Sequence, residues 1–243
     1  MAYNYGYMAL MVKKIVVCTA WGSPFSWTHA AYNMMNLTRP SGVDVMFTPG
    51  YGWCPARRHM YGVERALEWG ASHVCFLGGD QVHELGILVK FTDHLESGYK
   101  VVTALVNSRG RVNEDQKPFQ SNAWKQEEDK FVRIDKEDNP LQEIDTIGSG
   151  ALIFDIGLLS SLKKPWFEEA VIDKDCNRVT TMDTRFVWRL RNEAKAKILC
   201  DCSIGTKHLE VFGIDDSFSE RFSDWPVATK DNKAEMLNLM YQL

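Results

Sequence analysis

The chain has 243 residues, of which 45% are hydrophobic and 25% are charged, and its formal net charge is −4. This length and balance predict one globular α/β domain with a substantial buried core. The acidic balance argues against nucleic acid as a partner, because a broad nucleic-acid interface needs a basic face. It still allows a local basic pocket for a nucleotide diphosphate.

The sequence also predicts a cytoplasmic protein. No apolar run approaches the roughly 18–20 residues that a membrane span requires, so no transmembrane segment is expected. Residues 1–11 are rich in tyrosine and lack the positive charge of a secretory signal, and residues 1–12 are expected to form a flexible extension. The six cysteines are scattered, so we expect buried free thiols in a reducing cytosol.

Predicted strands and helices alternate along the first hundred residues. The predicted strands are 13–19, 43–48, 74–77 and 101–106, and the predicted helices are 26–37, 55–69 and 84–97. Pro55 suits the first turn of the second helix, and Gly70 ends it. The side chains of that helix expected to face the core are Ala56, Met60, Val63 and Leu67. This alternation predicts a doubly wound, mostly parallel sheet flanked by helices.

The second half of the chain is more mixed. Residues 107–130 are polar and predict a long surface excursion, which is either a solvated loop or a lid that carries Arg109, Arg111 and Lys117. Short strands are predicted at 131–134, 144–147, 151–154 and 197–202, a short helix at 155–162, an apolar plug at 165–167, and helices at 183–194 and 231–241. We expect one domain over residues 1–243.

Asp80 is the first candidate functional residue. It follows a short apolar strand and two glycines, at the sheet edge where α/β proteins build their sites. Its carboxylate oxygens suit Mg²⁺ or Mn²⁺ together with substrate phosphates. The alternative is that Asp80 only caps the helix predicted to begin near Glu84.

Three further groups have a functional and a structural interpretation. Arg57 and Arg58 lie in the first turn of a helix, where the backbone favours anions, or they are simply solvated. The glycines of the Gly148–Gly150 turn allow close approach of a ligand, or they form a plain turn. Asp183 begins a helix and is either its cap or a general base.

A late group contains Cys200, Cys202 and His208. The two sulfurs point to one face of a predicted strand, which makes a zinc site conceivable, but a second close Cys/His pair is missing. Alternatively, His208 is a ligand of the metal that Asp80 also holds.

Taken in order, these motifs resemble the GT-A glycosyltransferases of the nucleotide-diphospho-sugar transferase superfamily. The segments that carry the resemblance are Ala56–Asp80, Gly148–Phe154, Pro165–Phe167, Asp183–Phe186 and His208. The resemblance covers residues 13–210. It implies a GT-A-like fold in which residues 13–106 form the nucleotide-binding half and residues 107–243 the acceptor-binding half.

The resemblance also implies a role for each candidate residue. Asp80 and His208 would bind Mn²⁺ or Mg²⁺, Arg57 would lie near the donor diphosphate, Thr19, Ala20 and Trp21 near the nucleobase, Gly148, Ser149 and Gly150 near the donor sugar, and Asp183 would be the acid or base on the acceptor side. The implied enzyme is a metal-dependent glycosyltransferase that moves a sugar from a nucleotide-diphospho-sugar donor to an unknown acceptor hydroxyl. The metal would stabilise the leaving nucleoside diphosphate.

The chain departs from the family pattern at Gly78, where the first aspartate of Asp-x-Asp usually stands. Either donor phosphates and His208 complete the metal shell, or Gln81 or His83 substitutes, or the chain is a non-catalytic nucleotide-sugar-binding module. Met182 likewise stands where an acidic residue is common. A nucleotidyltransferase is a further alternative, but residues 20–24 contain one glycine and no basic residue, whereas that class has a basic glycine-rich loop here.

Overall fold

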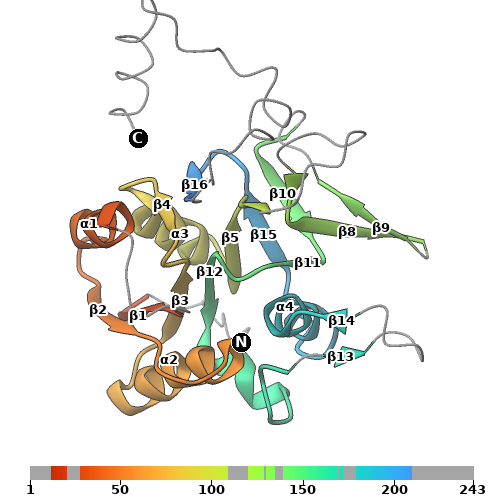
Figure 1. The fold of residues 1–243 in the computed structure, drawn as a ribbon, viewed down its shortest axis with the longest axis horizontal. Coiled ribbons are helices and arrows are strands. Elements are labelled where there is room, and N and C mark those ends of the chain that lie inside the picture. Colours follow the sequence, from red (N-terminus) through yellow and green to blue (C-terminus); the bar gives the residue numbers. More distant parts are fainter. Residues whose placement is uncertain are drawn as a thin grey trace, which may run out of the picture. The chain divides into compact units, whose positions relative to one another are not determined.

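The computed structural model describes residues 12–20, 28–108, 120–128, 130–134, 139–168, 170–171 and 179–209, all of which belong to one compact unit. Seven strands form one sheet in the order β10-β15-β5-β12-β3-β1-β2 (Figure 1). They are β1 (Lys14–Thr19), β2 (Asp44–Pro49), β3 (His73–Leu77), β5 (Val101–Ala104), β10 (Leu141–Ile144), β12 (Ala151–Asp155) and β15 (Ile198–Asp201).

Most strands of this sheet run in one direction. β1 is parallel to β2 and β3, and β15 is parallel to β5. The antiparallel strand β12 lies between β3 and β5, so all five of these strands share one direction, and only β12 and β10 oppose it. The prediction of a mostly parallel α/β sheet is therefore confirmed.

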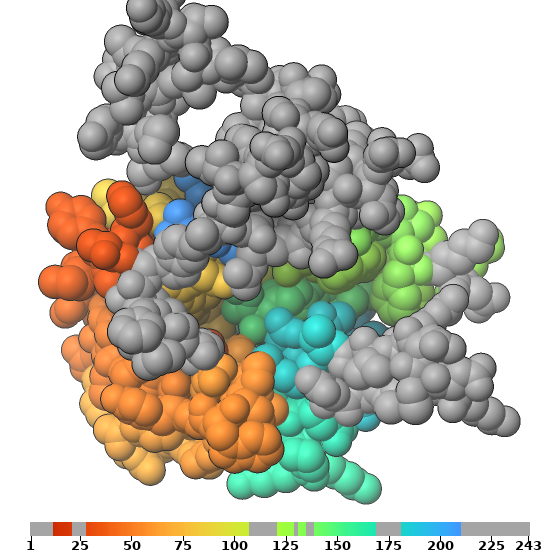
Figure 2. Space-filling view, viewed as in Figure 1, coloured from red at the N-terminus to blue at the C-terminus, as the bar shows by residue number. Residues whose placement is uncertain are grey.

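Helices cover both faces of the sheet. They are α1 (Thr28–Asn36), α2 (Pro55–Trp69), α3 (Ile87–Glu96) and α4 (Met182–Asn192), with a 3₁₀ helix, η1 (Ile156–Ser161). Successive strand residues point to opposite faces. Phe76 packs with Val63 of α2 and Phe186 of α4, whereas Leu77 packs with Phe91 of α3 and with α1. The sheet is thus doubly wound, and α2 and α4 lie side by side on one face (Figures 1 and 2).

The boundaries predicted for α2 are confirmed. Pro55 is its first residue, and Gly70 ends it in the left-handed conformation with φ 66°. Its buried residues are His59, Gly62, Val63 and Ala66. Leu67 is 51% exposed, so the prediction that it faces the core is wrong. The prediction is confirmed for Val63, which is fully buried, and for Ala56 and Met60, which are partly buried and pack against the core.

The predicted surface excursion over residues 107–130 is wrong at its carboxyl-terminal end. That end forms β8 (Ala123–Glu127), which pairs with β9 (Lys130–Arg133) and β11 (Thr146–Ile147). Ala123 is fully buried, so this part of the segment belongs to the core. The single strand predicted over residues 144–147 is divided at Asp145 between β10 and β11. The short strands β6 (Asn107–Ser108), β7 (Gln120–Ser121), β13 (Ala170–Val171) and β14 (Val179–Thr180) complete the list of elements outside the main sheet and the candidate site.

Two small predicted features are confirmed. Asp155 caps η1, because its carboxylate accepts a hydrogen bond of 2.8 Å from the Gly157 N–H. Trp166 and Phe167 of the apolar plug are buried.

Several predictions fall outside the described residues. These are the amino-terminal extension, Trp21, the predicted lid residues Arg109, Arg111 and Lys117, and the helix at 231–241. The single domain over residues 1–243 also stays a prediction. Within the described ranges, no helix is both long enough and apolar enough to span a bilayer.

Candidate functional site

The main candidate residues lie at the carboxyl edge of the parallel strands. Thr19 is the last residue of β1, and Asp80 follows the end of β3 by three residues. The Gly148–Gly150 turn enters the antiparallel strand β12 from the same edge, because the Gly150 carbonyl accepts a hydrogen bond of 2.7 Å from the Gly78 N–H. This is the edge at which open α/β sheets bind their ligands.

A pair of short strands brings Asp80 and His208 together. β4 (Gln81–His83) pairs antiparallel with β16 (Thr206–His208), and the Leu209 N–H donates to the Asp80 carbonyl at 2.8 Å. As a result, Nε2 of His208 lies 3.5 Å from Oδ2 of Asp80, and the two side chains are 18% and 26% exposed. The two predicted metal ligands are therefore neighbours, although they come from distant parts of the sequence.

Asp80 does not cap the helix that follows it. β4 intervenes, and α3 begins only at Ile87 with Gly86 at its N-cap position. The capping alternative for Asp80 is therefore wrong, and so is the predicted helix start near Glu84. Three extended residues in β4 carry the chain past the position where a helix was expected.

The side chain of Gln81 fills the space beside Gly78. A Cβ atom at Gly78 would lie 2.6 Å from the Gln81 amide carbon, and one at Gly150 would lie 2.5 Å from its amide nitrogen. Gln81 is 3% exposed, and its Oε1 has no hydrogen-bond partner among the described residues. A buried neutral amide therefore lies between Gly78 and Gly150, close to Asp80 in the sequence.

His83 is a second buried polar side chain near Asp80. Burial lowers the pKa of His83 to about 4, while the Gly78 backbone and the Asp80 carboxylate oppose this effect and His208 adds to it. Neither ring nitrogen has a partner in hydrogen-bond geometry within the described ranges. These ranges contain no group of three or more His, Cys, Asp or Glu side chains that could hold a metal ion. A role of His83 as a metal ligand stays a prediction.

Asp183 lies in the first turn of α4 and holds the Gly148–Gly150 turn. Its Oδ2 accepts from the Ser149 N–H at 3.0 Å and lies 3.3 Å from the Ser149 hydroxyl oxygen, and its Oδ1 accepts from the Thr184 N–H at 2.9 Å. Thr181, not Asp183, occupies the N-cap position, so the capping alternative for Asp183 is wrong.

Asp183 is an ionised carboxylate. Burial acts to raise the pKa of Asp183, but hydrogen bonds from Thr181, Ser149 and Thr184, together with the charge of His59, hold it below the ordinary value of 3.8. A carboxylate that is ionised at neutral pH can accept a proton from a ligand hydroxyl.

His59 belongs to none of the motifs predicted from the sequence, and it contacts Ser149. His59 is 5% exposed, its Nδ1 lies 2.9 Å from the Pro55 carbonyl oxygen, and its Nε2 lies 2.8 Å from Ser149 Oγ. Its ring packs against Phe76 and Phe167 at centroid distances of 4.5 and 5.2 Å. The 3.6-residue periodicity of α2 was the signal that could have placed His59 inside.

The two arginines in the first turn of α2 contact residues close to them in the sequence. Arg57 pairs with Glu64 on the same helix at 2.7 Å, with both side chains about two-fifths exposed, and Arg58 Nε donates to the Gly52 carbonyl at 3.0 Å. The role of Arg57 at a donor diphosphate stays a prediction. At the end of β1, the Thr19 carbonyl accepts from the Gly50 N–H at 2.8 Å, which ties the ends of β1 and β2 together.

The described cysteines are free thiols, as predicted for Cys18, Cys75, Cys200 and Cys202, which are buried; Cys54 is half-buried. The sulfurs of Cys200 and Cys202 lie 3.8 Å apart. Since the described residues offer no metal-binding group around them, the zinc alternative has no support here.

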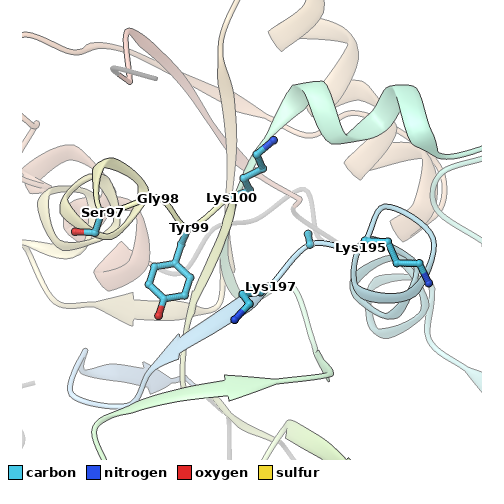
Figure 3. A pocket seen from close by; sticks show the side chains of 7 residues that line it. Ser97, Gly98, Tyr99, Lys100, Lys195 and Lys197 are labelled. Carbon is cyan, nitrogen blue, oxygen red and sulfur yellow. The ribbon is translucent and has the colours of Figure 1, made fainter. Parts of the chain in front are cut away.

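A pocket of about 340 Å³ lies away from these residues (Figure 3). Its lining includes Lys100, which precedes β5, and Lys197, which precedes β15. It therefore lies at the amino ends of these strands, opposite the edge that carries Asp80, and it contains none of the predicted site residues.

No protein-family model matches the chain, and no curated protein matches it. Among solved structures, the chain is similar to A197 from STIV, with a TM-score of 0.55 and 16% identity over 84% of this chain and 86% of that chain. It is also similar to the inositol-1-phosphate CTP transferase from T. maritima (TM-score 0.45, 10% identity, 90% and 99% covered). A UDP-glucose pyrophosphorylase complexed with UDP-glucose gives a TM-score of 0.44 and 12% identity over 81% and 92% of the two chains. The similarity to A197 concerns the fold alone.

Proposed function

We propose that this chain is a cytoplasmic transferase that binds a nucleotide-diphospho-sugar through a divalent cation and moves the sugar to an acceptor hydroxyl. The observation that carries the proposal is the 3.5 Å contact between Asp80 and His208 at the carboxyl edge of the sheet. A carboxylate and an imidazole at this edge suit a cation that also binds phosphate.

Asp80 and His208 would hold Mn²⁺ or Mg²⁺, and the mixed oxygen and nitrogen donors favour Mn²⁺. With two protein ligands, the remaining coordination positions belong to water and diphosphate oxygens, which is common where a cation binds a phosphorylated ligand. When bound, the cation would neutralise the charge that develops on the leaving nucleoside diphosphate.

The neighbouring residues supply the rest of the proposed site. Thr19 and Ala20 would border the nucleobase, and Arg57 would approach the diphosphate. The Gly148–Gly150 turn lies against the Asp80 loop through the hydrogen bond between Gly78 and Gly150, so a sugar held there would lie close to the cation. Asp183 would take the proton of the acceptor hydroxyl as general base.

A non-catalytic nucleotide-sugar-binding module is the second candidate, and the Gln81 amide favours it. A neutral amide beside Gly78 attracts a cation less than a carboxylate would. A nucleotidyltransferase is a third candidate; the lack of a basic residue in residues 20–24 is the sequence feature that argues against it.

Nucleotide-sugar hydrolysis with and without Mn²⁺ tests the proposal. We expect Mn²⁺-dependent turnover by the wild type, a loss of roughly 100-fold or more in Asp80→Ala and His208→Ala, and little change in Asp155→Ala, an aspartate at the opposite edge. Mn²⁺-dependent nucleoside-diphosphate binding without turnover would favour the binding module. Full activity of Asp80→Ala would refute the metal assignment, and absence of nucleotide binding would refute both candidates.

A further inference from the structure

Three side chains form a buried chain between α2 and α4. His59 contacts Ser149, and Ser149 contacts Asp183. We propose that His59 and Ser149 are a proton relay behind Asp183, through which the proton that Asp183 takes from an acceptor hydroxyl passes to the imidazole. This inference rests on the proposed function, in which Asp183 is the base.

The tautomer of His59 is set by its backbone contact. The Pro55 carbonyl is only an acceptor, so Nδ1 of His59, 2.9 Å away, carries a hydrogen and donates it. In the neutral ring, Nε2 is then without a hydrogen and accepts the hydroxyl hydrogen of Ser149 at 2.8 Å. Nε2 is therefore the atom that is able to take up a proton.

The single hydroxyl hydrogen of Ser149 faces two acceptors. When His59 is neutral, the hydrogen goes to Nε2, and the contact of 3.3 Å between Ser149 Oγ and Asp183 Oδ2 has no hydrogen. When His59 is protonated, Nε2–H donates to Oγ and Oγ–H donates to Asp183. Both contacts, His59 to Ser149 and Ser149 to Asp183, are thus hydrogen bonds at the same time only after His59 has been protonated.

The proposed step moves one proton and changes no other bond. After Asp183 takes a proton from the acceptor hydroxyl on Oδ2, that proton passes to Ser149 Oγ while the hydroxyl hydrogen of Ser149 passes to His59 Nε2. Asp183 returns to a carboxylate, Ser149 remains a hydroxyl, and His59 becomes an imidazolium. The base is regenerated inside the site without contact with bulk water.

The surroundings of His59 favour its neutral form, so the imidazolium would hold the proton only temporarily. Burial lowers the pKa of His59, and Arg58 adds to the effect, while the Pro55 carbonyl and Asp183 oppose it. Among the described residues, the charged groups that act on His59 are Arg58 on its own helix and Asp183 on α4, and the ring packs against Phe76 and Phe167. A protonated His59 therefore depends on the charge of Asp183 and releases its proton back through Ser149.

Side-chain ¹⁵N NMR of the full chain between about pH 4 and pH 8 tests the relay. We expect the pKa of His59 to fall by about 1 in both Asp183→Asn and Ser149→Ala, because the imidazolium loses its charged partner or the hydroxyl that connects it. His73, equally buried and bonded to Ser72 at the far end of β3, is the matched internal control and should not change. An unchanged His59 titration in both variants would overturn the relay.

Kinetics separate the relay from the proposed function. If the chain transfers sugar, Ser149→Ala should lower kcat by about 100-fold with little change in KM for the nucleotide-sugar, and Ser149→Thr, which keeps the hydroxyl, should restore much of it. A merely structural role for Ser149 would not couple the titration of His59 to Asp183. Coupled titration without turnover would refute the function and leave only the hydrogen-bonded coupling of His59 to Asp183, whereas turnover with an uncoupled His59 would refute the relay alone.

Discussion

No side chain fits at position 78 without a shift, because the amide of Gln81 occupies the space beside Gly78. The same amide packs against Gly150, so Gly78, Gly150 and Gln81 pack together where β3 ends and β12 begins. A side chain at position 78 would therefore have to displace the Gln81 amide.

Gly78→Asp should destabilise the protein by about 1–3 kcal/mol, because the new Cβ displaces the buried amide of Gln81. The same substitution in a Gln81→Ala background should cost clearly less, since the space is then open. Urea unfolding of the wild type, the two single variants and the double variant measures the coupling free energy between positions 78 and 81. An equal cost in both backgrounds would contradict the packing described for Gln81.

The sequence indicated the reactive residues better than their partners. Asp80 and His208 were predicted from residue type and from their positions after strands, and the structure places them in contact. Gln81 and His59 could not be assigned in this way. The place of the Gln81 amide depends on the backbone of Gly150, and the role of His59 depends on Ser149, which lies 90 residues away.

At the level of elements, α2 and β4 show what local signals can predict. The boundaries of α2 follow from Pro55 and Gly70, which act within the segment itself. β4 has three residues and owes its conformation to β16, which comes more than 120 residues later. A pairing with a distant strand leaves no periodic pattern in the local sequence. The sequence therefore predicted a helix from residue 84, whereas α3 begins only at Ile87, after β4.

Gly62→Ala tests how closely α2 packs on β1. Alanine favours a helix interior by about 1 kcal/mol over glycine, but a Cβ at Gly62 would lie 2.5 Å from the Cys18 sulfur and 2.7 Å from its Cβ. Overpacking of a core costs about 1–3 kcal/mol, so we expect a net loss of stability in urea unfolding. Gly86→Ala, at the N-cap of α3, is a control for a Gly→Ala change without overpacking, because the nearest atom lies 3.7 Å from the new Cβ; it does not test helix propensity.

A Cys18→Ala background should reduce the cost of Gly62→Ala without removing it, because the sulfur is gone but the Cβ of residue 18 would still lie 2.7 Å from the new methyl group. A gain in stability from Gly62→Ala alone would mean that α2 and β1 are packed less closely than described.

At the level of the whole molecule, three buried histidines link stability to pH. Burial lowers the pKa of His59, His73 and His83 below the ordinary value of 6.5, to about 4 for His83. At a pH between the pKa of a histidine in the folded chain and its ordinary value of 6.5, the unfolded chain binds a proton that the folded chain does not. The free energy of unfolding is therefore highest above pH 6.5 and decreases as the pH falls, by about 3 kcal/mol for His83 alone.

We expect the free energy of unfolding to fall between about pH 7 and pH 5. His73→Gln, far from the candidate site, should flatten this dependence, whereas His29→Gln, on the exposed side of α1, should leave it unchanged. Denaturant titrations at several pH values measure the slope. A stability that rises toward pH 5, or a slope that His73→Gln does not alter, would contradict the assignment.

Calorimetric titration of UDP and GDP into the protein, with and without Mn²⁺, tests whether Asp80 and His208 form a metal site. We expect one of the two nucleotides to bind at least about tenfold more tightly with Mn²⁺. Asp80→Ala and His208→Ala should abolish this Mn²⁺ effect, and Asp155→Ala should retain it. Nucleotide binding that does not depend on Mn²⁺, or an Mn²⁺ effect that persists in Asp80→Ala, would contradict a metal site between Asp80 and His208.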